Sequence, residues 1–331
     1  MLRLPRFTYH RPTSVAEAVR IAADHGPASQ YVAGGTDLWP NMKRGVQRPS
    51  EVVSLAGCEE LRRRDGTPTE GVTLGAMTTL TAVEHDAELL AHHPAFVHAA
   101  SVVSTPLLRN MGTIGGNLLL DTRCNYYDQS HEWRESISFC MKCDGETCWV
   151  APSSPRCWAV QSSDTVPLLC AVGAEVSLQG PDGGRRIPLD ALYRDDGIRF
   201  TTRLPGEVLT AVHLPPTGGW RASYRKLRRR GSFDFPVLGV AACLHFDGEV
   251  CTRAEIRIGG AGSYAIPAEA SAARLVGTRL VAGDPASEER ILVAAQEAFK
   301  PTRAMDNTDH LASWRKKMAP VFVARAVRDC L

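Results

Sequence analysis

A cysteine-rich segment constrains this chain more than any other feature of its sequence. Five of its ten cysteines fall between positions 124 and 157, and Trp133 and Trp149 lie among them. Such a local density of thiols is typical of ligands gathered around a metal centre. The aromatic side chains would supply an apolar shell that limits the access of solvent to that centre. The segment therefore predicts a metal site.

Three kinds of site compete for these cysteines. A disulfide knot is disfavoured, because the first residues, MLRLPRFTYHRP, contain no apolar stretch typical of an export signal. Structural zinc and an iron–sulfur cluster both need four thiolates, and spacing alone does not separate them. The C-x-x-C spacing of Cys140 and Cys143 favours these two residues as ligands. The metal and the ligand set stay open at this point.

Composition and charge exclude several classes of function. The 331 residues, 44% hydrophobic and 22% charged, suit a globular protein of two or three domains. A net charge of +2 gives no reason to expect nucleic acid as a partner. No apolar run is long enough to span a membrane. We expect a cytoplasmic protein, in which thiols stay reduced and free to bind metal.

Two glycine-rich segments precede the cysteines. A helix is predicted over residues 14–25, with Ser14 and Glu17 as a capping pair, and a strand over 30–33 runs from it into Gly34-Gly35-Thr36-Asp37. The second segment is Arg109 to Asn117. Glycine turns can aim several backbone N–H groups at one phosphate. Together the two predict a clasp for a dinucleotide, although neither has the G-x-G-x-x-G pattern of a Rossmann site.

The remaining pattern is of mixed strands and helices. Strands are predicted at 52–55, 72–76, 174–178, 208–214, 238–246 and 254–259, and helices at 79–85, 87–92, 94–105, 166–172, 287–299 and 311–327. The segment Pro215–Gly219 has the composition of a linker. Strands followed by helices after this linker predict a separate α+β domain at the C-terminal end.

Several motifs together resemble one protein family. They are VAGGTDL (32–38), LGAMTTL (74–80), TIGGNL (113–118), SSDTVPLL (162–169), PGEVLTAVHLP (205–215) and SWRKKMAPVFVARAV (313–327), with Lys226 and Arg230. In this order they resemble the FAD-binding subunit of the molybdenum hydroxylases, the family of xanthine oxidase and carbon monoxide dehydrogenase. The resemblance implies an α+β fold of the CO dehydrogenase flavoprotein type. Its FAD-binding domain would have two parts, 1–57 and 58–216, and the smaller C-terminal domain would cover 217–331.

The cysteine segment, at about 122–160, separates two motifs that lie close together in ordinary members of the family. It is similar to an insertion in the flavin subunit of 4-hydroxybenzoyl-CoA reductases, which holds a [4Fe–4S] cluster. This resemblance implies Cys124, Cys140, Cys148 and Cys157 as the ligands. Cys143 would then be the spare thiol, which differs from what the C-x-x-C spacing favours.

The resemblance also implies the FAD contacts. The first loop would contribute Gln30, Tyr31, Val32, Ala33, Gly34, Gly35, Thr36 and Asp37, and the second Thr113, Ile114, Gly115, Gly116 and Asn117. Asp164 would accept hydrogen bonds from the adenosine ribose or from a neighbouring backbone group. Leu209 would line the adenine pocket, Lys226 would lie near the flavin, and Val103 would stand where relatives can carry a larger ring.

The function implied is electron transfer without a catalytic acid or base in this chain. Electrons from a ferredoxin would pass through the cluster and FAD to two [2Fe–2S] clusters on a small subunit, then to the molybdenum cofactor on a large one. A dimer of heterotrimers is expected, and the reaction would be the dehydroxylation of 4-hydroxybenzoyl-CoA. The alternatives are the FAD subunit of an oxidative molybdenum hydroxylase and, from another class, a zinc-stabilised interaction module.

Overall fold

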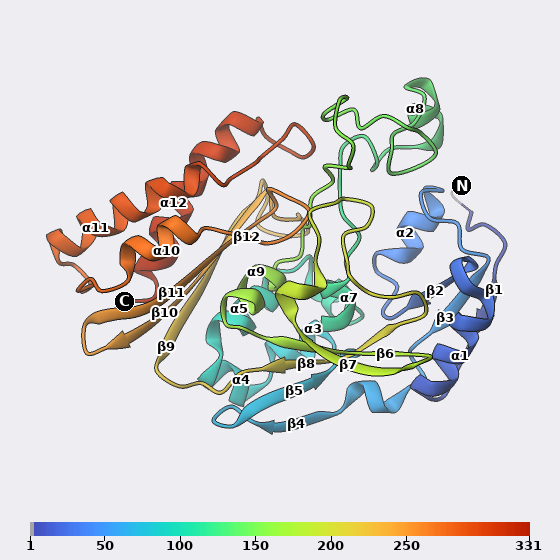
Figure 1. Ribbon diagram of the computed structural model, residues 1–331. Helices are drawn as coiled ribbons and strands as arrows, with labels where there is room; N and C mark the ends of the chain where they lie inside the picture. Colours follow the sequence, from blue (N-terminus) through green and yellow to red (C-terminus); the bar gives the residue numbers. More distant parts are fainter. Residues whose placement is uncertain (1–2) are drawn as a thin grey trace.

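The N-terminal part of the chain is a small parallel sheet with a helix on it. The computed structural model describes residues 3–331, and its first sheet has the order β1-β3-β2 (Figure 1). Its elements are β1 (Thr8–His10), α1 (Val15–His25), β2 (Ser29–Val32), α2 (Leu38–Lys43) and β3 (Glu51–Ser54). The side chain of Ser14 accepts a hydrogen bond from the backbone N–H of Glu17 and caps α1, as its sequence predicts. Val15, Ala18, Val19 and Ala22 then form the buried face of this helix.

The middle part is a five-stranded antiparallel sheet with short helices. Its strand order is β4-β5-β8-β6-β7. The strands are β4 (Arg64–Thr67), β5 (Gly71–Gly75), β6 (Glu175–Gly180), β7 (Gly183–Pro188) and β8 (Val208–Leu214). The helices are α3 (Leu80–Glu84), α4 (Ala87–His92), α5 (Pro94–Ser101), α6 (Pro106–Arg109), α7 (Ile114–Leu118) and α9 (Thr165–Ala171). Their apolar residues form one continuous core with the inner face of the sheet.

The C-terminal part is a second antiparallel sheet covered by three helices. The strand order is β12-β11-β10-β9; α10 and α12 lie on this sheet, and α11 packs on these two helices, at the left of Figure 1. The bounds are β9 (Trp220–Leu227), β10 (Leu238–Asp247), β11 (Val250–Gly259), β12 (Ile266–Pro267), α10 (Glu269–Leu275), α11 (Pro285–Gln296) and α12 (Ala312–Arg328). Helix α9 of the middle part packs on β10 and β11, so it joins the two cores.

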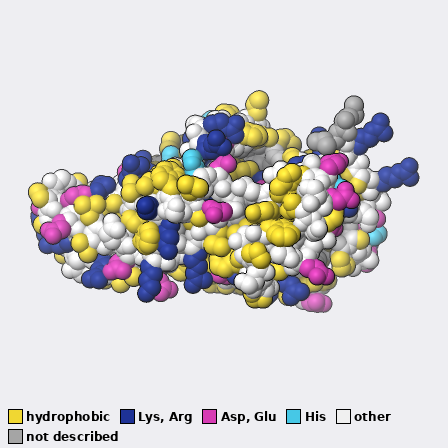
Figure 2. All heavy atoms as spheres, turned by 90° about the horizontal axis from the view of Figure 1, so that it is seen from above, with side chains coloured by type: hydrophobic (Ala, Val, Ile, Leu, Met, Phe, Trp, Pro, Cys, Tyr) yellow, Lys and Arg dark blue, Asp and Glu magenta, His cyan; other side chains and the backbone are white. Residues whose placement is uncertain are grey.

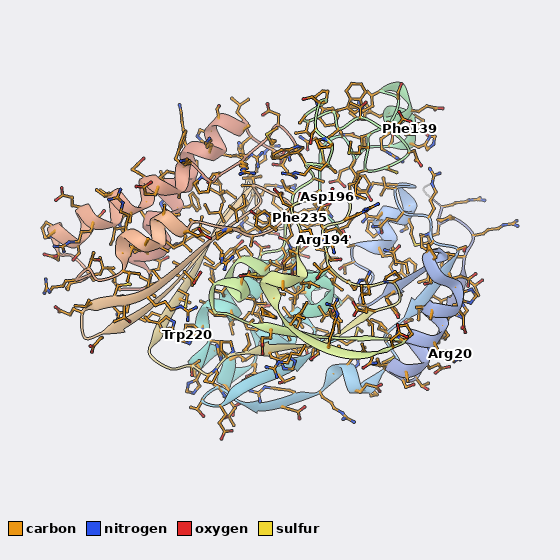
Figure 3. All side chains as sticks on the ribbon, viewed as in Figure 1. Arg20, Phe139, Arg194, Asp196, Trp220 and Phe235 are labelled. Atoms are coloured by element: carbon orange, nitrogen blue, oxygen red, sulfur yellow. The ribbon has the colours of Figure 1, made fainter. Side chains whose placement is uncertain are left out.

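The cysteine-rich segment stands out from these layers as a separate lobe. Its root is a backbone bridge in which Arg123 and Val160 each donate an N–H to the other's carbonyl oxygen at 2.8 Å. Its helix is α8 (His131–Ser136), at the top of Figure 1. Figure 2 views the molecule from that side, and Figure 3 places Phe139 in the lobe, well away from Trp220 at the start of β9.

The α+β fold class is confirmed, and most predicted elements are present. Strand β8 has the predicted bounds, and α1, α4, α9 and α12 differ from theirs by two residues or fewer. Helix α5 was predicted to reach residue 105 but ends at Ser101, and Ser104 has a left-handed φ of 49°. Strand β7 was not predicted, because it begins with two glycines and is mostly exposed. Among the described residues, no helix is both long enough and apolar enough to cross a membrane.

Candidate functional site

The first glycine loop presents free backbone donors. It follows β2 and leads into α2, and Gly35 has a φ of 73°, a value that glycine adopts without strain. Within residues 3–331, no acceptor lies at hydrogen-bond distance from the backbone N–H groups of Gly34, Gly35, Thr36 or Asp37. Successive free N–H groups at a turn form an anion-binding nest. The loop can therefore bind a phosphate group without a basic side chain.

The two glycine motifs touch each other. A Cβ atom at Gly34 would lie 1.6 Å from the carbonyl oxygen of Met111, so only glycine permits this approach. A Cβ atom at Gly116 would lie 3.9 Å from the Cβ of Ala33. The predicted meeting of the two motifs is present in the structure.

The second motif is a short helix and not an open turn. Thr113 caps α7 by accepting a hydrogen bond from the N–H of Gly116 at 3.1 Å. The N–H of Ile114 donates to Thr78, that of Gly115 to Ala76, and that of Asn117 to Thr113. The N–H groups of residues 114–117 are thus hydrogen-bonded within the protein, whereas that of Thr113 is not. That residues 113–117 hold the pyrophosphate through backbone N–H groups stays a prediction.

Asn117 acts through its side chain. Its carboxamide oxygen accepts hydrogen bonds from the hydroxyls of Ser163 and Thr165, both at 2.6 Å. All three residues are buried. This network fixes the start of α9 against the end of α7, and with it the position of Asp164 between the two hydroxyl residues.

Asp164 and Lys226 form a buried ion pair. The Lys226 Nζ lies 2.9 Å from an Asp164 carboxylate oxygen and 2.9 Å from the carbonyl oxygen of Val102. The hydroxyl of Tyr224 donates to the other Asp164 oxygen at 2.8 Å. Both charged side chains are 3% exposed. Burial raises the pKa of Asp164 and lowers that of Lys226, and their attraction opposes both shifts. The two predicted residues are brought together, and each holds the other.

The other predicted flavin residues are partly or fully buried. Tyr31 donates its hydroxyl to the carbonyl oxygen of Gly206 at 2.7 Å, and Gln30 donates to Gln47 at 3.4 Å. Val32 is buried in a small cluster, and Val103 packs partly buried on the middle core. Leu209 is buried in that same core, with Leu178 as its cross-strand partner.

Asp37 connects the first loop to the root of the insertion. Its carboxylate accepts from the guanidinium of Arg123 at 2.8 Å and from the amide of Asn41 at 3.1 Å. Burial raises the pKa of Asp37, and Arg123 opposes that shift. The guanidinium of Arg123 also lies 3.6 Å from the ring centre of Phe235, which Figure 3 labels below the insertion. The loop and the insertion are therefore mechanically joined.

Four cysteines of the insertion line one small cavity. Cys124, Cys140, Cys148 and Cys157 are all buried, with exposed fractions of 4–6%. The cavity, about 10 Å³, has walls of Tyr126, Tyr127, Met141, Lys142, Trp149 and Val150. Burial raises the pKa of Cys124 to about 12. Thiolates collected in such apolar surroundings require a bound cation to offset their charge.

Cys143 does not line this cavity. Its sulfur accepts a hydrogen bond from the buried guanidinium of Arg134 at 3.0 Å and lies 3.7 Å from the carbonyl oxygen of Val46. Burial raises the pKa of Cys143 to about 11. Cys140 and Cys143 form the two ends of a tight turn, since the N–H of Cys143 donates to the carbonyl oxygen of Cys140. This turn directs the two thiols to different surroundings, although their spacing favours a ligand pair.

Lys142 holds a cation beside the cysteine cavity. Its ammonium donates to Asp121, to the hydroxyl of Thr122 and to the carbonyl oxygen of Gly197, each at 2.8 Å. It also lies 4.8 Å from the ring centre of Tyr127. This buried ion pair stands between the cavity and the body of the protein. Sequence reasoning missed this residue, because a lysine inside a run of cysteines carries no distinct local signal.

A residue of the C-terminal part fixes both ends of the insertion. The carbonyl oxygen of Asn307 accepts from the N–H of Asn125 at 2.8 Å, and its side-chain amide donates to the carbonyl oxygen of Trp158 at 2.6 Å. Asn125 and Trp158 each follow a cysteine of the cavity. Arg315, fully buried, donates to the Asn307 side chain at 3.2 Å. Nothing in the sequence connects position 307 with the cysteines, so this contact could not be predicted.

A larger cavity lies elsewhere. It has a volume of about 490 Å³ and is lined by residues of α4, α5, β9 and the end of the chain, among them His93 and Trp220. None of the predicted cofactor or metal residues lines it. Its size alone does not make it the functional site, because the free N–H groups and the buried charges lie at the other end of β9.

Comparison with known proteins decides the family. Residues 5–217 match the model for the FAD binding domain in molybdopterin dehydrogenase, and residues 222–330 match that for the CO dehydrogenase flavoprotein C-terminal domain. The chain belongs to the FAD-binding subunits of the molybdenum hydroxylase family.

Individual members of that family match over most of their length. The carbon monoxide dehydrogenase medium chain of Afipia carboxidovorans is 31% identical over 97% of this chain and 95% of its own. The Escherichia coli aldehyde oxidoreductase FAD-binding subunit PaoB is 31% identical over 81% of this chain and 86% of its own. A solved carbon monoxide dehydrogenase from Hydrogenophaga pseudoflava superposes with a TM-score of 0.81 at 25% identity, covering 99% of this chain and 98% of that one. The subunit is thus an FAD-binding component of an oxidoreductase.

Proposed function

We propose that this chain is the electron-transfer subunit of a reductive molybdenum hydroxylase of the 4-hydroxybenzoyl-CoA reductase type. It would bind FAD and, in its insertion, a [4Fe–4S] cluster held by Cys124, Cys140, Cys148 and Cys157. One observation carries the proposal: these four thiols line a single buried cavity, and Cys143 does not.

Four thiolates can hold either one tetrahedral zinc ion or a [4Fe–4S] cluster. The similarity of the insertion to that of the flavin subunit of 4-hydroxybenzoyl-CoA reductases favours the cluster. Cys148 and Cys157 are hydrogen-bonded to each other, so these two thiols would have to separate to bind different iron atoms.

The residues proposed for FAD follow from the same geometry. The N–H groups of residues 34–37 would bind the diphosphate, and the exposed Thr36 and Gly116 flank that nest. The Asp164–Lys226 pair would set the local charge beside the flavin, and Val103 and Leu209 would be apolar neighbours. None of these side chains is proposed as a catalytic acid or base.

Bound together, a flavin and a cluster supply exchange between one-electron and two-electron carriers. The chain's own residues would hold the two groups in separate compartments, joined through Asp37 and Arg123. A ferredoxin would be the donor, and a small [2Fe–2S] subunit and a large molybdenum-cofactor subunit would complete a dimer of heterotrimers in the cytoplasm. The domain limits 57/58 and 216/217 belong to this proposal.

A second candidate is the FAD subunit of an oxidative molybdenum hydroxylase. The matches to a carbon monoxide dehydrogenase and to an aldehyde oxidoreductase favour it. Such a subunit needs FAD but gives no role to a metal centre in the insertion.

The deciding experiment measures iron, acid-labile sulfide, zinc and flavin in the anaerobically purified protein, with EPR after reduction by dithionite. Four iron and four sulfide per FAD, with a reduced-cluster signal, are the expected result. FAD with zinc, or FAD without iron, would refute the reductive assignment and leave the oxidative one.

Two cysteine variants test the ligand set. Cys148→Ser removes a wall of the cavity and should abolish the EPR signal while FAD stays bound. Cys143→Ser, the matched control from the same turn, should keep both iron and flavin. Loss of iron in Cys143→Ser would show that the chosen ligand set is wrong.

A further inference from the structure

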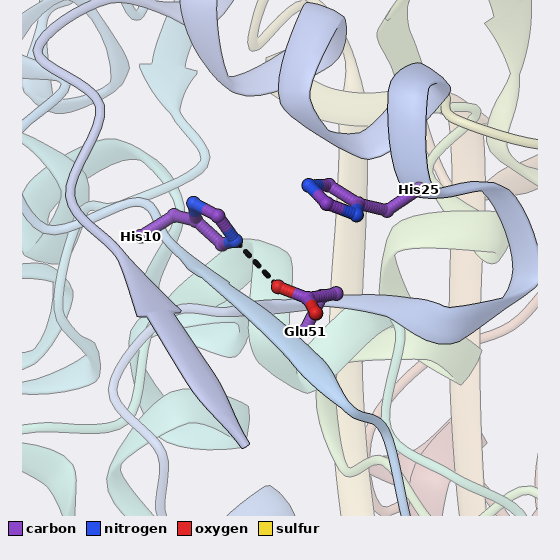
Figure 4. A group of neighbouring side chains, drawn as sticks. All are labelled: His10, His25 and Glu51. Atoms are coloured by element: carbon purple, nitrogen blue, oxygen red, sulfur yellow. Dashed lines mark hydrogen bonds and ion pairs between the residues drawn. The ribbon is translucent and has the colours of Figure 1, made fainter.

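A second group of metal-binding side chains lies in the N-terminal part of the chain. His10 at the end of β1, His25 at the end of α1 and Glu51 at the start of β3 converge on one point (Figure 4). One nitrogen from each histidine and one carboxylate oxygen all lie within 4.8 Å of one another. Three separate elements therefore present three ligand atoms to a shared space.

Part of this group is already ordered. The Nε2 of His10 lies 2.7 Å from one Glu51 oxygen, and the hydroxyl of Thr8 donates to the other oxygen at 3.4 Å. The His10 and Glu51 side chains are 22% and 17% exposed, so both positions are held by their surroundings.

His25 completes the group from the exposed side. Its ring centre lies 5.2 Å from that of His10. It is the last residue of α1, where the helix dipole favours a cation. Because His25 is exposed, its ring can turn by the short distance needed to complete a coordination sphere, and solvent has access to a fourth position.

The chemistry of this set selects a class of metal. Two imidazoles and one carboxylate are borderline ligands that suit zinc and its first-row neighbours better than calcium or magnesium, which prefer oxygen. Three protein ligands with an open fourth position are a common zinc arrangement. The set contains no thiolate, so it differs chemically from the cysteine cavity.

We propose that His10, His25 and Glu51 form a binding site for one Zn²⁺ ion. The ion would tie the end of α1 to the end of β1 and the start of β3. It would lie at the start of β2 and β3, whereas the glycine loop begins at the other end of β2, since Ser29 pairs with Glu51 and Val32 with Ser54. Its role is therefore structural stabilisation of the N-terminal sheet. The inference does not depend on the proposed cluster.

The test uses the full chain with its flavin and iron bound. Titration with Zn²⁺ in a calorimeter should show one site, and Zn²⁺ should raise the midpoint of thermal unfolding relative to protein treated with a chelator. Titration with Co²⁺ reports the ligands, because nitrogen and oxygen donors give weak ligand-field bands without the intense charge-transfer band that thiolates produce. Both signals are expected in the wild-type protein.

Variants decide whether these residues are the site. His25→Ala should weaken Zn²⁺ binding at least about tenfold, and Glu51→Gln should also weaken it. Because His25 is exposed, the unfolding midpoint of His25→Ala without zinc should change little. His85→Ala, which removes another exposed histidine, is the matched control and should bind as the wild type does. Unchanged affinity in His25→Ala, or a thiolate band with Co²⁺, would overturn the proposal, as would the absence of any Zn²⁺ binding.

Discussion

The buried pair of Asp164 and Lys226 allows the sharpest test of the site. In the variant Lys226→Met, a carboxylate would stay buried with only the Tyr224 hydroxyl as a neutral donor. Removing one partner of a buried ion pair typically costs about 3–5 kcal/mol, because the remaining charge keeps its desolvation penalty. We expect a loss of that size in the free energy of unfolding.

The assay is urea unfolding of flavin-free protein at neutral pH, so that ligand binding adds nothing to the stability. Lys317→Met serves as the control. Lys317 is exposed, and its replacement should change the free energy of unfolding by less than about 0.5 kcal/mol.

A double variant separates charge from packing. In Lys226→Met/Asp164→Asn the uncompensated charge is gone, and the protein should recover at least about 1 kcal/mol relative to Lys226→Met alone. Two results would contradict this reasoning. One is that Lys226→Met lowers the free energy of unfolding no more than Lys317→Met does. The other is that adding Asp164→Asn to Lys226→Met lowers it further, by as much as Asp164→Asn does alone.

Three further results are expected. Gly34→Ala should lose FAD, since its Cβ would lie 1.6 Å from a carbonyl oxygen. Gly173→Ala should only lower stability, because its φ is 76° but no atom lies within 4 Å of its Cβ. Equal flavin content in both variants would contradict the role of the loop. Asn307→Ala should speed the loss of iron to a chelator but leave FAD bound, because it removes the hydrogen bond to Trp158 at one end of the insertion. An unchanged rate of iron loss would show that this hydrogen bond does not hold the insertion in place. Burial lowers the pKa of His93 from 6.5 to about 4. The folded protein is therefore not penalised at His93 above pH 6.5, and it loses up to about 3 kcal/mol of stability as the pH falls toward 4. Unfolding curves of His93→Phe should show a weaker loss over this pH range, and an equal loss would refute this.

Local sequence patterns predicted many elements of this fold. Ser14 and Glu17 marked the start of α1, and the apolar run at 208–214 marked β8, because capping and side-chain periodicity act between near neighbours. The patterns failed where glycine and exposed polar residues form a strand, as in β7, or where a glycine motif forms a capped helix, as in α7. Pairing with the preceding strand β6 stabilises β7, and hydrogen bonds to Ala76 and Thr78 stabilise α7, although the local residues disfavour both structures.

The candidate site divides in the same way. The sequence by itself determined the family resemblance, the two glycine motifs and the presence of five cysteines in one segment. Only the tertiary structure decided that the N–H groups of residues 34–37 are left without a protein acceptor and that Asp164 meets Lys226. It also separated Cys143 from the four thiols that share a cavity, because the turn from Cys140 to Cys143 and the contact with Arg134 direct that sulfur away. Spacing along the chain sets which residues can meet, but the direction of each side chain depends on what packs around it.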